Sequence, residues 1–488
     1  MRAMVKRRIA LSLLLVVAIA AAASAQDGKR RQMRAGAATS NITPPLGSLI
    51  VGNWDSPPAT YVHDELHARV LVLDDGETRV AIVVSDNLGI PRNVCDAAKR
   101  IVNEKTGLPV SHMLMAATHT HSAASARSGD YTEGDLNEYQ RFLAMRIADG
   151  VLRAIANLEP AQIGWGVGRE PSQVFNRRWR MKPNSPELRN PFGGMDLVRM
   201  NPPVGHPDLI EPAGPTDPEI HFISVRSPSG RHIALLANYS LHYVGGVPAG
   251  HISADYFGVF AERIGELLKA EKQDPPFVGI LSNGTSGNIN NINFRGDDPP
   301  RKWKPYEKMR AVANQVAAEV LRAMQSIQYH DFVPLGIAQT EIPMGIRVPS
   351  EADLKWANSV LSRPANAPSN HVREAIYAQR TLDMSKLPNQ IPLILQALRI
   401  GDVGIAAIPA ETFVEIGLEI RKRSPFKQTF TISLANGSYG YLPTVEQHKL
   451  GGYETWRGTN ILEVQAAPKI IDALIHLLQR LQTAESPQ

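Results

Sequence analysis

Cysteine is almost absent from this chain of 488 residues, which contains one, Cys95. A single thiol excludes an intramolecular disulfide and a metal site built from thiolates. Beyond the N-terminal segment, no stretch is apolar for long enough to cross a bilayer. Hydrophobic residues make up 43% of the chain and charged residues 20%. This balance excludes a disordered or collagen-like protein and predicts a globular protein with a substantial core.

The first 25 residues have the pattern of a secretory signal. A basic start, MRAMVKRR, precedes an apolar stretch from Ile9 to Ala22, and Ala23-Ser24-Ala25 supplies small residues for cleavage. The apolar stretch is too short to favour a permanent membrane span, although an uncleaved N-terminal anchor is the alternative. We therefore expect residues 1–25 to be removed and the mature protein to be exported, periplasmic or secreted.

The net charge is also small once residues 1–25 are left out. The formal net charge of the chain is +5, and removing the four basic residues of the first 25 leaves +1. A nearly neutral chain has no electrostatic basis for binding nucleic acid. We therefore expect no nucleic-acid partner, and the sequence leaves the oligomeric state open.

Short β-branched runs alternate with amphipathic helical stretches from about residue 66 onward. Strand–helix–strand alternation predicts parallel pairs, whereas residues 66–85 and 219–237 predict antiparallel hairpins. The predicted fold is α/β, with a mixed β-sheet core flanked by helices in a single large catalytic domain, residues 26–488. Residues 170–218 predict a long surface excursion, and no internal repeat is visible. The expected strands are 66–75, 78–85, 113–118, 219–227, 232–238, 277–283, 403–409 and 430–435, and the expected helices are 93–105, 256–272, 306–324, 350–363, 371–383 and 467–481.

Polar residues follow several of the predicted strands at the point where each strand ends. They include His119 and His121, His242, Glu411 and Tyr441. Ligands of α/β proteins bind outside the carboxyl ends of strands, and two residues spaced by two on extended backbone point the same way. Imidazoles with a carboxylate form a ligand set suited to zinc. The alternative is a pair of histidines hydrogen-bonded to nearby backbone or carboxylate groups.

A series of ordered motifs resembles the neutral/alkaline non-lysosomal ceramidase family, in its catalytic N-terminal domain. The resemblance runs from about Ala35 to Trp456, and its specificity lies in the order of the motifs. It implies a hydrolase acting on linear amide C–N bonds, which converts ceramide-like sphingolipids to fatty acid and sphingoid base. The motifs are RAGAATSNITPPLG, LHARVLVLDDG, VAIVVSDNLG, ATHTHS, NYSLHY, HISADYFG, IPAETF, LANGSYGYLPT and GGYE.

The resemblance also implies roles for individual residues. One catalytic Zn2+ would be held by His119, His242, Glu411 and Tyr441. His121, Arg177 and Tyr453 would surround the scissile amide, with His121 protonating the leaving amine. Zinc lowers the pKa of bound water to about 7 and so supplies a nucleophile at neutral pH.

Three departures from the family pattern bear on the substrate. Asn290 stands where the family has a serine, so we expect Asn290, with Arg177, to bind substrate rather than to act as a nucleophile. The segment SAASARSG replaces a glycine-proline run after the histidine motif. No C-terminal immunoglobulin-like domain is expected after the final helix.

These departures keep two alternatives open. The first is a zinc amidase or esterase that acts on another N-acyl substrate. The second is a non-catalytic exported binding protein with the same fold. In the preferred interpretation the partner is a small lipid-like amide substrate, with peripheral contact to membrane lipid.

Overall fold

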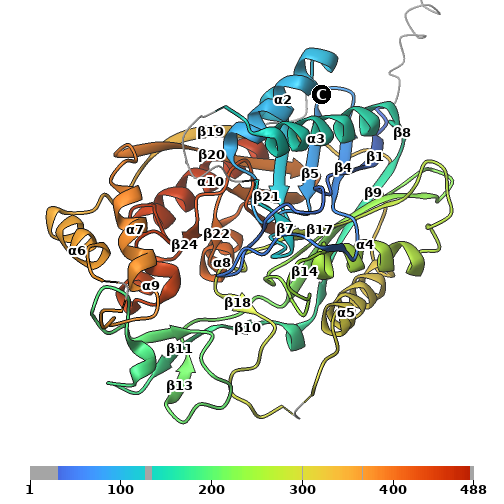
Figure 1. Ribbon diagram of the computed structural model, residues 1–488. Helices are drawn as coiled ribbons and strands as arrows, with labels where there is room; N and C mark the ends of the chain where they lie inside the picture. Colours follow the sequence, from blue (N-terminus) through green and yellow to red (C-terminus); the bar gives the residue numbers. More distant parts are fainter. Residues whose placement is uncertain (1–30, 127–134, 299–300, 365, 484–488) are drawn as a thin grey trace, which may run out of the picture.

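The computed structural model describes residues 31–126, 135–298, 301–364 and 366–483 (Figure 1). The secretory signal predicted for residues 1–25 lies outside these ranges. Among the described residues, no helix combines the length and the apolar character that a membrane crossing requires.

The first sheet has the strand order β6–β5–β4–β1–β8. Both β1 and β5 pair antiparallel with β4, and β6 runs parallel to β5. One helix connects β5 to β6, and a second helix follows β6 and packs on β1 and β4. The strands are β1 (Arg34–Asn41), β4 (His67–Asp74), β5 (Arg79–Ser85), β6 (Met113–Ala117) and β8 (Glu159–Pro160), and the helices are α2 (Arg92–Thr106) and α3 (Glu138–Ala156).

Two further sheets repeat this arrangement of strands and helices. In each, three successive antiparallel strands are followed by a helix, a parallel strand and a second helix. Because the sequence shows no internal repeat, the repetition is visible only in the fold. The second unit contains β9 (Gln162–Arg169), β14 (Glu219–Arg226), β15 (His232–Tyr239), α4 (Asp255–Leu267), β17 (Val278–Asn283) and α5 (Glu307–Met324). The third contains β19 (Leu335–Gly345), β20 (Gln390–Ile400), β21 (Val403–Ile408), α8 (Val414–Arg423), β23 (Gln428–Ser433) and α10 (Ala466–Thr483).

The inner faces of the three sheets share one apolar core. Leu71 and Ile82 of the first sheet, Leu236 of the second, and Leu398 and Ile432 of the third belong to the same buried cluster. The outer faces are covered by α2 and α3, by α4 and α5, and by α8 and α10, respectively (Figure 1). Burial on both faces explains why the parallel strands are continuous apolar runs rather than alternating ones.

Strand direction places several connections at one edge of each sheet. Because β1 and β5 both run antiparallel to β4, and β6 is parallel to β5, all three end at the same edge. The same geometry holds in the other two sheets. The connection from the first to the second strand of each unit therefore also lies at this edge. These connections are residues 42–66, 170–218 and 346–389, called here the first, second and third insertions.

The insertions and the short loops at this edge contain small elements of their own. Those of the insertions are β2 (Ile50–Val51), β3 (Tyr61–Val62), β10 (Phe175–Asn176), β11 (Arg178–Met181), β12 (Val198–Met200), β13 (Leu209–Pro212), α6 (Glu351–Leu361) and α7 (Glu374–Met384). Those of the loops are β7 (Ala123–Ala124), β16 (His251–Ile252), β18 (Ile289–Asn290), β22 (Glu411–Thr412), β24 (Tyr441–Leu442) and α9 (Val445–Leu450).

The predicted fold class is confirmed: the described chain is a single, mainly α/β domain with mixed sheets flanked by helices. Each predicted strand and helix is present, and both predicted hairpins are antiparallel. The prediction missed β9, β19, β20, α3 and α8. In β9 (QIGWGVGR) the reason is its glycines, which disfavour strands. They are needed because a Cβ at Gly166 would lie 2.7 Å from the Phe222 ring.

Gly36 marks the closest approach of α3 to the first sheet. A Cβ at this position would lie 2.1 Å from the carbonyl oxygen of Ala154. We expect Gly36→Ala to lower the free energy of unfolding by about 1–3 kcal/mol, because the helix must move away from β1. Urea denaturation measures the change. Gly194→Ala is the control, since the added Cβ would meet only the Asn190 side chain, and equal losses in both variants would contradict the prediction.

Candidate metal centre

Three histidine side chains converge at the edge where the strands end. His119 and His121 follow β6 of the first unit, and His242 follows β15 of the second. One ligand nitrogen from each lies within 4.8 Å of those of the other two. The Nε2 atoms of His119 and His121 are 3.2 Å apart, so their imidazoles can reach the same ion.

The backbone at His119 differs from the extended conformation that the prediction assumed. Its φ is 73°, in the left-handed region, and its N–H donates to the carbonyl oxygen of Asn87 at 2.9 Å. The reason given for the two imidazoles sharing one side was therefore wrong, although they do meet. A non-glycine residue in this conformation costs roughly 1–3 kcal/mol, and such strain concentrates at functional sites.

Two backbone carbonyl groups orient the buried imidazoles. The Nδ1 atom of His119 lies 2.6 Å from the Leu88 carbonyl oxygen, and that of His242 lies 3.0 Å from the Ser286 carbonyl oxygen. Because a carbonyl oxygen only accepts, both Nδ1 atoms carry hydrogen and both Nε2 atoms present lone pairs. The buried Nε2 of His242 has no hydrogen-bond partner within the described ranges. This is the arrangement that histidine metal ligands adopt in proteins.

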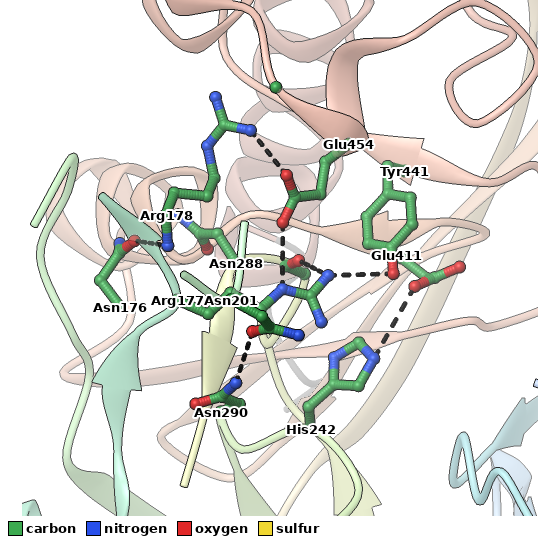
Figure 2. A network of polar contacts seen from close by, with 12 residues as sticks. Asn176, Arg177, Arg178, Asn201, His242, Asn288, Asn290, Glu411, Tyr441 and Glu454 are labelled. Carbon is green, nitrogen blue, oxygen red and sulfur yellow. Dashed lines mark hydrogen bonds and ion pairs between the residues drawn. The ribbon is translucent and has the colours of Figure 1, made fainter. Parts of the chain in front are cut away.

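Glu411 and Tyr441 reach the same place from the third unit. They are direct partners in the parallel pairing of β22 with β24. The Oε2 atom of Glu411 lies 3.1 Å from Nε2 of His119. It lies 4.0 Å from Nε2 of His242 (Figure 2). Imidazole nitrogens and a carboxylate oxygen are donors that zinc accepts, so the residues present fit the expected ion.

Burial governs the pKa values of the ring groups at this site. It lowers the pKa of both His121 and His242 well below the usual range, and neighbouring positive groups lower it further. It raises the pKa of Tyr441 well above the usual range and outweighs the opposing effect of Arg177. At neutral pH the two imidazoles are therefore uncharged, which is the form that binds a metal.

Arg177 connects the metal centre to a buried ion-pair network. Its Nη2 donates to the Tyr441 hydroxyl at 3.0 Å and to the Gly287 carbonyl at 2.8 Å, and its Nε donates to Glu454 at 3.0 Å. Glu454 also accepts from Arg178 at 2.6 Å (Figure 2). Burial alone lowers the pKa of Arg177, but Tyr441 and Glu454 outweigh it and raise that pKa, so the guanidinium stays charged.

Tyr453 and Asn290 lie beside this network. The Tyr453 ring is 5.8 Å from that of Tyr441, and its hydroxyl makes no hydrogen bond to any described residue. The Asn290 side chain donates to Asn201 at 2.8 Å and accepts from the Ile292 N–H at 2.9 Å. Both polar ends of Asn290 are thus engaged within the protein, and its role in substrate binding stays a prediction.

The structure therefore brings His119, His121, His242, Glu411, Tyr441 and Arg177 together, with Tyr453 and Asn290 adjacent. Sequence reasoning did not identify Glu454, although it follows Tyr453 in the motif GGYE. It also did not identify Tyr243, whose ring stacks on His121 at 3.7 Å. The carbonyl groups of Leu88 and Ser286 left no signal, because every residue type has one.

Glu454 compensates two buried positive charges, those of Arg177 and Arg178. We expect Glu454→Gln to lower the free energy of unfolding by about 3 kcal/mol, because both guanidinium groups lose their counter-charge in a buried setting. Glu266→Gln is the control, since it removes an exposed partner of Arg263 and should cost less than about 1 kcal/mol. Denaturant unfolding of the two variants measures the difference, and similar values would show that the network adds nothing to stability.

The sequence of this chain is similar to that of a characterised enzyme. No family model matches the chain. The neutral ceramidase of Pseudomonas aeruginosa is 22% identical over 457 residues, which cover 80% of this chain and 64% of that protein. The chain thus spans slightly less than two thirds of the curated relative it matches.

Two solved structures have the same fold. The crystal structure of neutral ceramidase from Pseudomonas aeruginosa superposes with a TM-score of 0.70 at 17% identity, and covers 94% of this chain and 77% of that one. A ceramidase complexed with C2 gives a TM-score of 0.68 at 16% identity, with the same coverage. The resemblance inferred from the ordered motifs is therefore confirmed, and this chain has the fold of the neutral ceramidases.

Proposed function

We propose that this protein is a zinc-dependent amidohydrolase that cleaves the N-acyl amide of ceramide-like sphingolipids to fatty acid and sphingoid base. The observation that carries the proposal is the convergence of three imidazoles and the Glu411 carboxylate beside a charged arginine, in this fold. The similarity to neutral ceramidases supports the substrate class.

His119, His242 and Glu411 would hold the ion, with Tyr441 as the fourth ligand. When bound, zinc would lower the pKa of a coordinated water to about 7 and polarise the amide carbonyl. The support for His119 and His242 is that each donates its Nδ1 hydrogen to a backbone carbonyl, which leaves Nε2 for the metal.

His121 is assigned to proton transfer. It is less buried than the other two histidines, and its Nδ1 has no hydrogen-bond partner within the described residues. A less buried imidazole suits a group that must gain and lose a proton. His121, uncharged beforehand, would take a proton from the attacking water and give it to the leaving amine as the C–N bond breaks.

Arg177 and Tyr453 would stabilise negative charge on the amide oxygen. Arg177 is buried, charged and held by Glu454, so it needs little rearrangement during the reaction. The Tyr453 hydroxyl is not used by any described residue. A preorganised donor of this kind contributes roughly 3 kcal/mol to transition-state stabilisation.

The proposal extends to location and to lipid contact. Export is supported by residues 1–25 alone. Peripheral contact with membrane lipid is supported by Leu46, Leu49 and Trp54, which are exposed large apolar side chains in the first insertion. Amphipathic aromatic and aliphatic side chains of this kind favour the lipid–water interface.

Metal-dependent hydrolysis of an amide tests the proposed function. Zinc-loaded protein is expected to release fatty acid from N-acylsphingosines, to lose this activity with a chelator and to regain it with zinc. Mass spectrometry of the products measures the reaction. Hydrolysis of short N-acyl amines in place of N-acylsphingosines would favour another N-acyl substrate. No hydrolysis of any amide would favour a binding protein.

Two histidine variants separate metal binding from proton transfer. His242→Ala is expected to lose both zinc and turnover, because a ligand is removed. His121→Ala is expected to keep zinc while its kcat falls by about 100-fold, the usual contribution of a general acid. Metal analysis and steady-state kinetics on the two variants measure these effects. A His121→Ala protein without zinc would instead make His121 a ligand.

A further inference from the structure

The three insertions enclose a cavity of about 230 Å³ beside the metal centre. Trp54 comes from the first insertion, Arg199 from the second and Arg373 from the third, and Tyr453 lines the same cavity. The Tyr453 ring is 5.7 Å from that of Trp54 and 5.8 Å from that of Tyr441. Tyr453 thus separates the cavity from the metal centre, and a substrate with its amide at the centre would present adjoining atoms to the cavity.

Positive charge predominates among the residues that line this cavity. Its arginines are Arg189, Arg199 and Arg373, and its acids are Glu187 and Asp196. The carboxylate of Glu187 forms an ion pair with the guanidinium of Arg199 at 2.8 Å. Neither Arg189 nor Arg373 has a carboxylate partner in the described part of the chain.

The second acid is engaged by neutral donors. The carboxylate of Asp196 accepts from the Trp456 indole at 2.8 Å and from the Asn190 amide at 3.0 Å. These contacts fix Asp196 in the wall of the cavity and direct its oxygens toward Trp456 and Asn190. The charge of Arg373 is therefore left without a carboxylate among the described residues.

Arg373 is held in place without being neutralised. Its guanidinium lies 3.6 Å from the centre of the Trp54 ring, and an aromatic face positions a cation while supplying no counter-charge. Burial lowers the pKa of Arg373, and Arg199 and Arg380 lower it further, against the opposing effects of Tyr377 and Tyr453. Burial, Arg373 and Arg199 also lower the pKa of His371, another lining residue. A bound anion would relieve this repulsion.

The size and lining of the cavity suit a small polar group. Its volume of about 230 Å³ is below the roughly 300–1,000 Å³ of pockets that enclose a drug-sized ligand. Val198 and Met200 are its only aliphatic side chains among the lining residues. A carboxylate or phosphate in this cavity would meet guanidinium groups, which bind both in paired hydrogen bonds.

We infer that the substrate carries an anionic group, a carboxylate or a phosphate, close to its scissile amide, and that Arg373 and Arg199 bind this group. The inference rests on the proposed function, since it takes the amide to lie at the metal centre. It narrows the substrate class from neutral N-acyl lipids to acidic ones. Arg189, which is exposed, lies at the rim and would add to the attraction.

Matched pairs of substrates that differ only in charge test the inference. One pair is N-dodecanoylglycine and N-dodecanoylglycinamide, and the other is N-hexanoylsphingosine with and without a 1-phosphate. The wild-type protein is expected to have a kcat/KM about tenfold higher for the charged member of at least one pair. Equal values within both pairs, or a preference for the neutral members, would overturn the inference and leave the proposed function standing.

Substitutions of Arg373 test whether a preference for charged substrates arises in this cavity. Arg373→Gln is expected to lower the charged-to-neutral ratio about tenfold, chiefly through KM, and Arg373→Lys should restore part of it. Arg263→Gln, at an exposed arginine of α4 that pairs with Glu266, should leave the ratio unchanged. A ratio that Arg373→Gln does not alter would also overturn the inference.

A binding measurement separates failure of the inference from failure of the proposed function. Sulfonamide analogues of the glycine pair, with SO2 in place of the carbonyl group, resist hydrolysis. Quenching of tryptophan fluorescence gives their Kd values for the wild-type protein and for Arg373→Gln. If no amide is hydrolysed, tighter binding of the charged analogue that depends on Arg373 would support the anion site alone. Equal Kd values would overturn it.

Discussion

The shared apolar core is the constraint on which the rest of the structure depends. Three sheets bury their inner faces against one another, so none of them can turn away without exposing that core. Each sheet has the same strand directions, and its third and fourth strands therefore end at one edge. Residues as distant in the chain as His119, His242 and Glu411 meet because these three edges meet. The candidate metal centre is a consequence of how the sheets pack.

Electrostatics inside the site follow from this burial. Two guanidinium groups share the carboxylate of Glu454, and one of them reaches the Tyr441 hydroxyl. Isolated charges would be expensive here, so each is paired or hydrogen-bonded. The imidazoles of His121 and His242 remain neutral for the same reason, and the neutral form is the one that binds a metal. The network thus keeps Arg177 charged beside the candidate ligands.

The insertions and the short loops contribute side chains to different parts of this edge. The loops after the third and fourth strands carry the groups that converge on the metal centre, whereas the connections between first and second strands carry Trp54, Arg199 and Arg373 around the neighbouring cavity. Loops on a rigid scaffold can change without disturbing the core. The insertions could therefore change their charges without moving the strands that carry the candidate ligands.

The sequence by itself determined the fold class, because apolar periodicity is a local property of the chain, and its ordered motifs supplied the candidate metal-site residues. It did not reveal β9, whose glycines permit close packing, nor the left-handed backbone at His119. Only the tertiary structure decided the pairing of Glu454 with Arg177 and Arg178, and the meeting of Trp54, Arg199 and Arg373. Those contacts join residues that are far apart in the chain, and no local pattern specifies which distant charges will be neighbours once the core has formed.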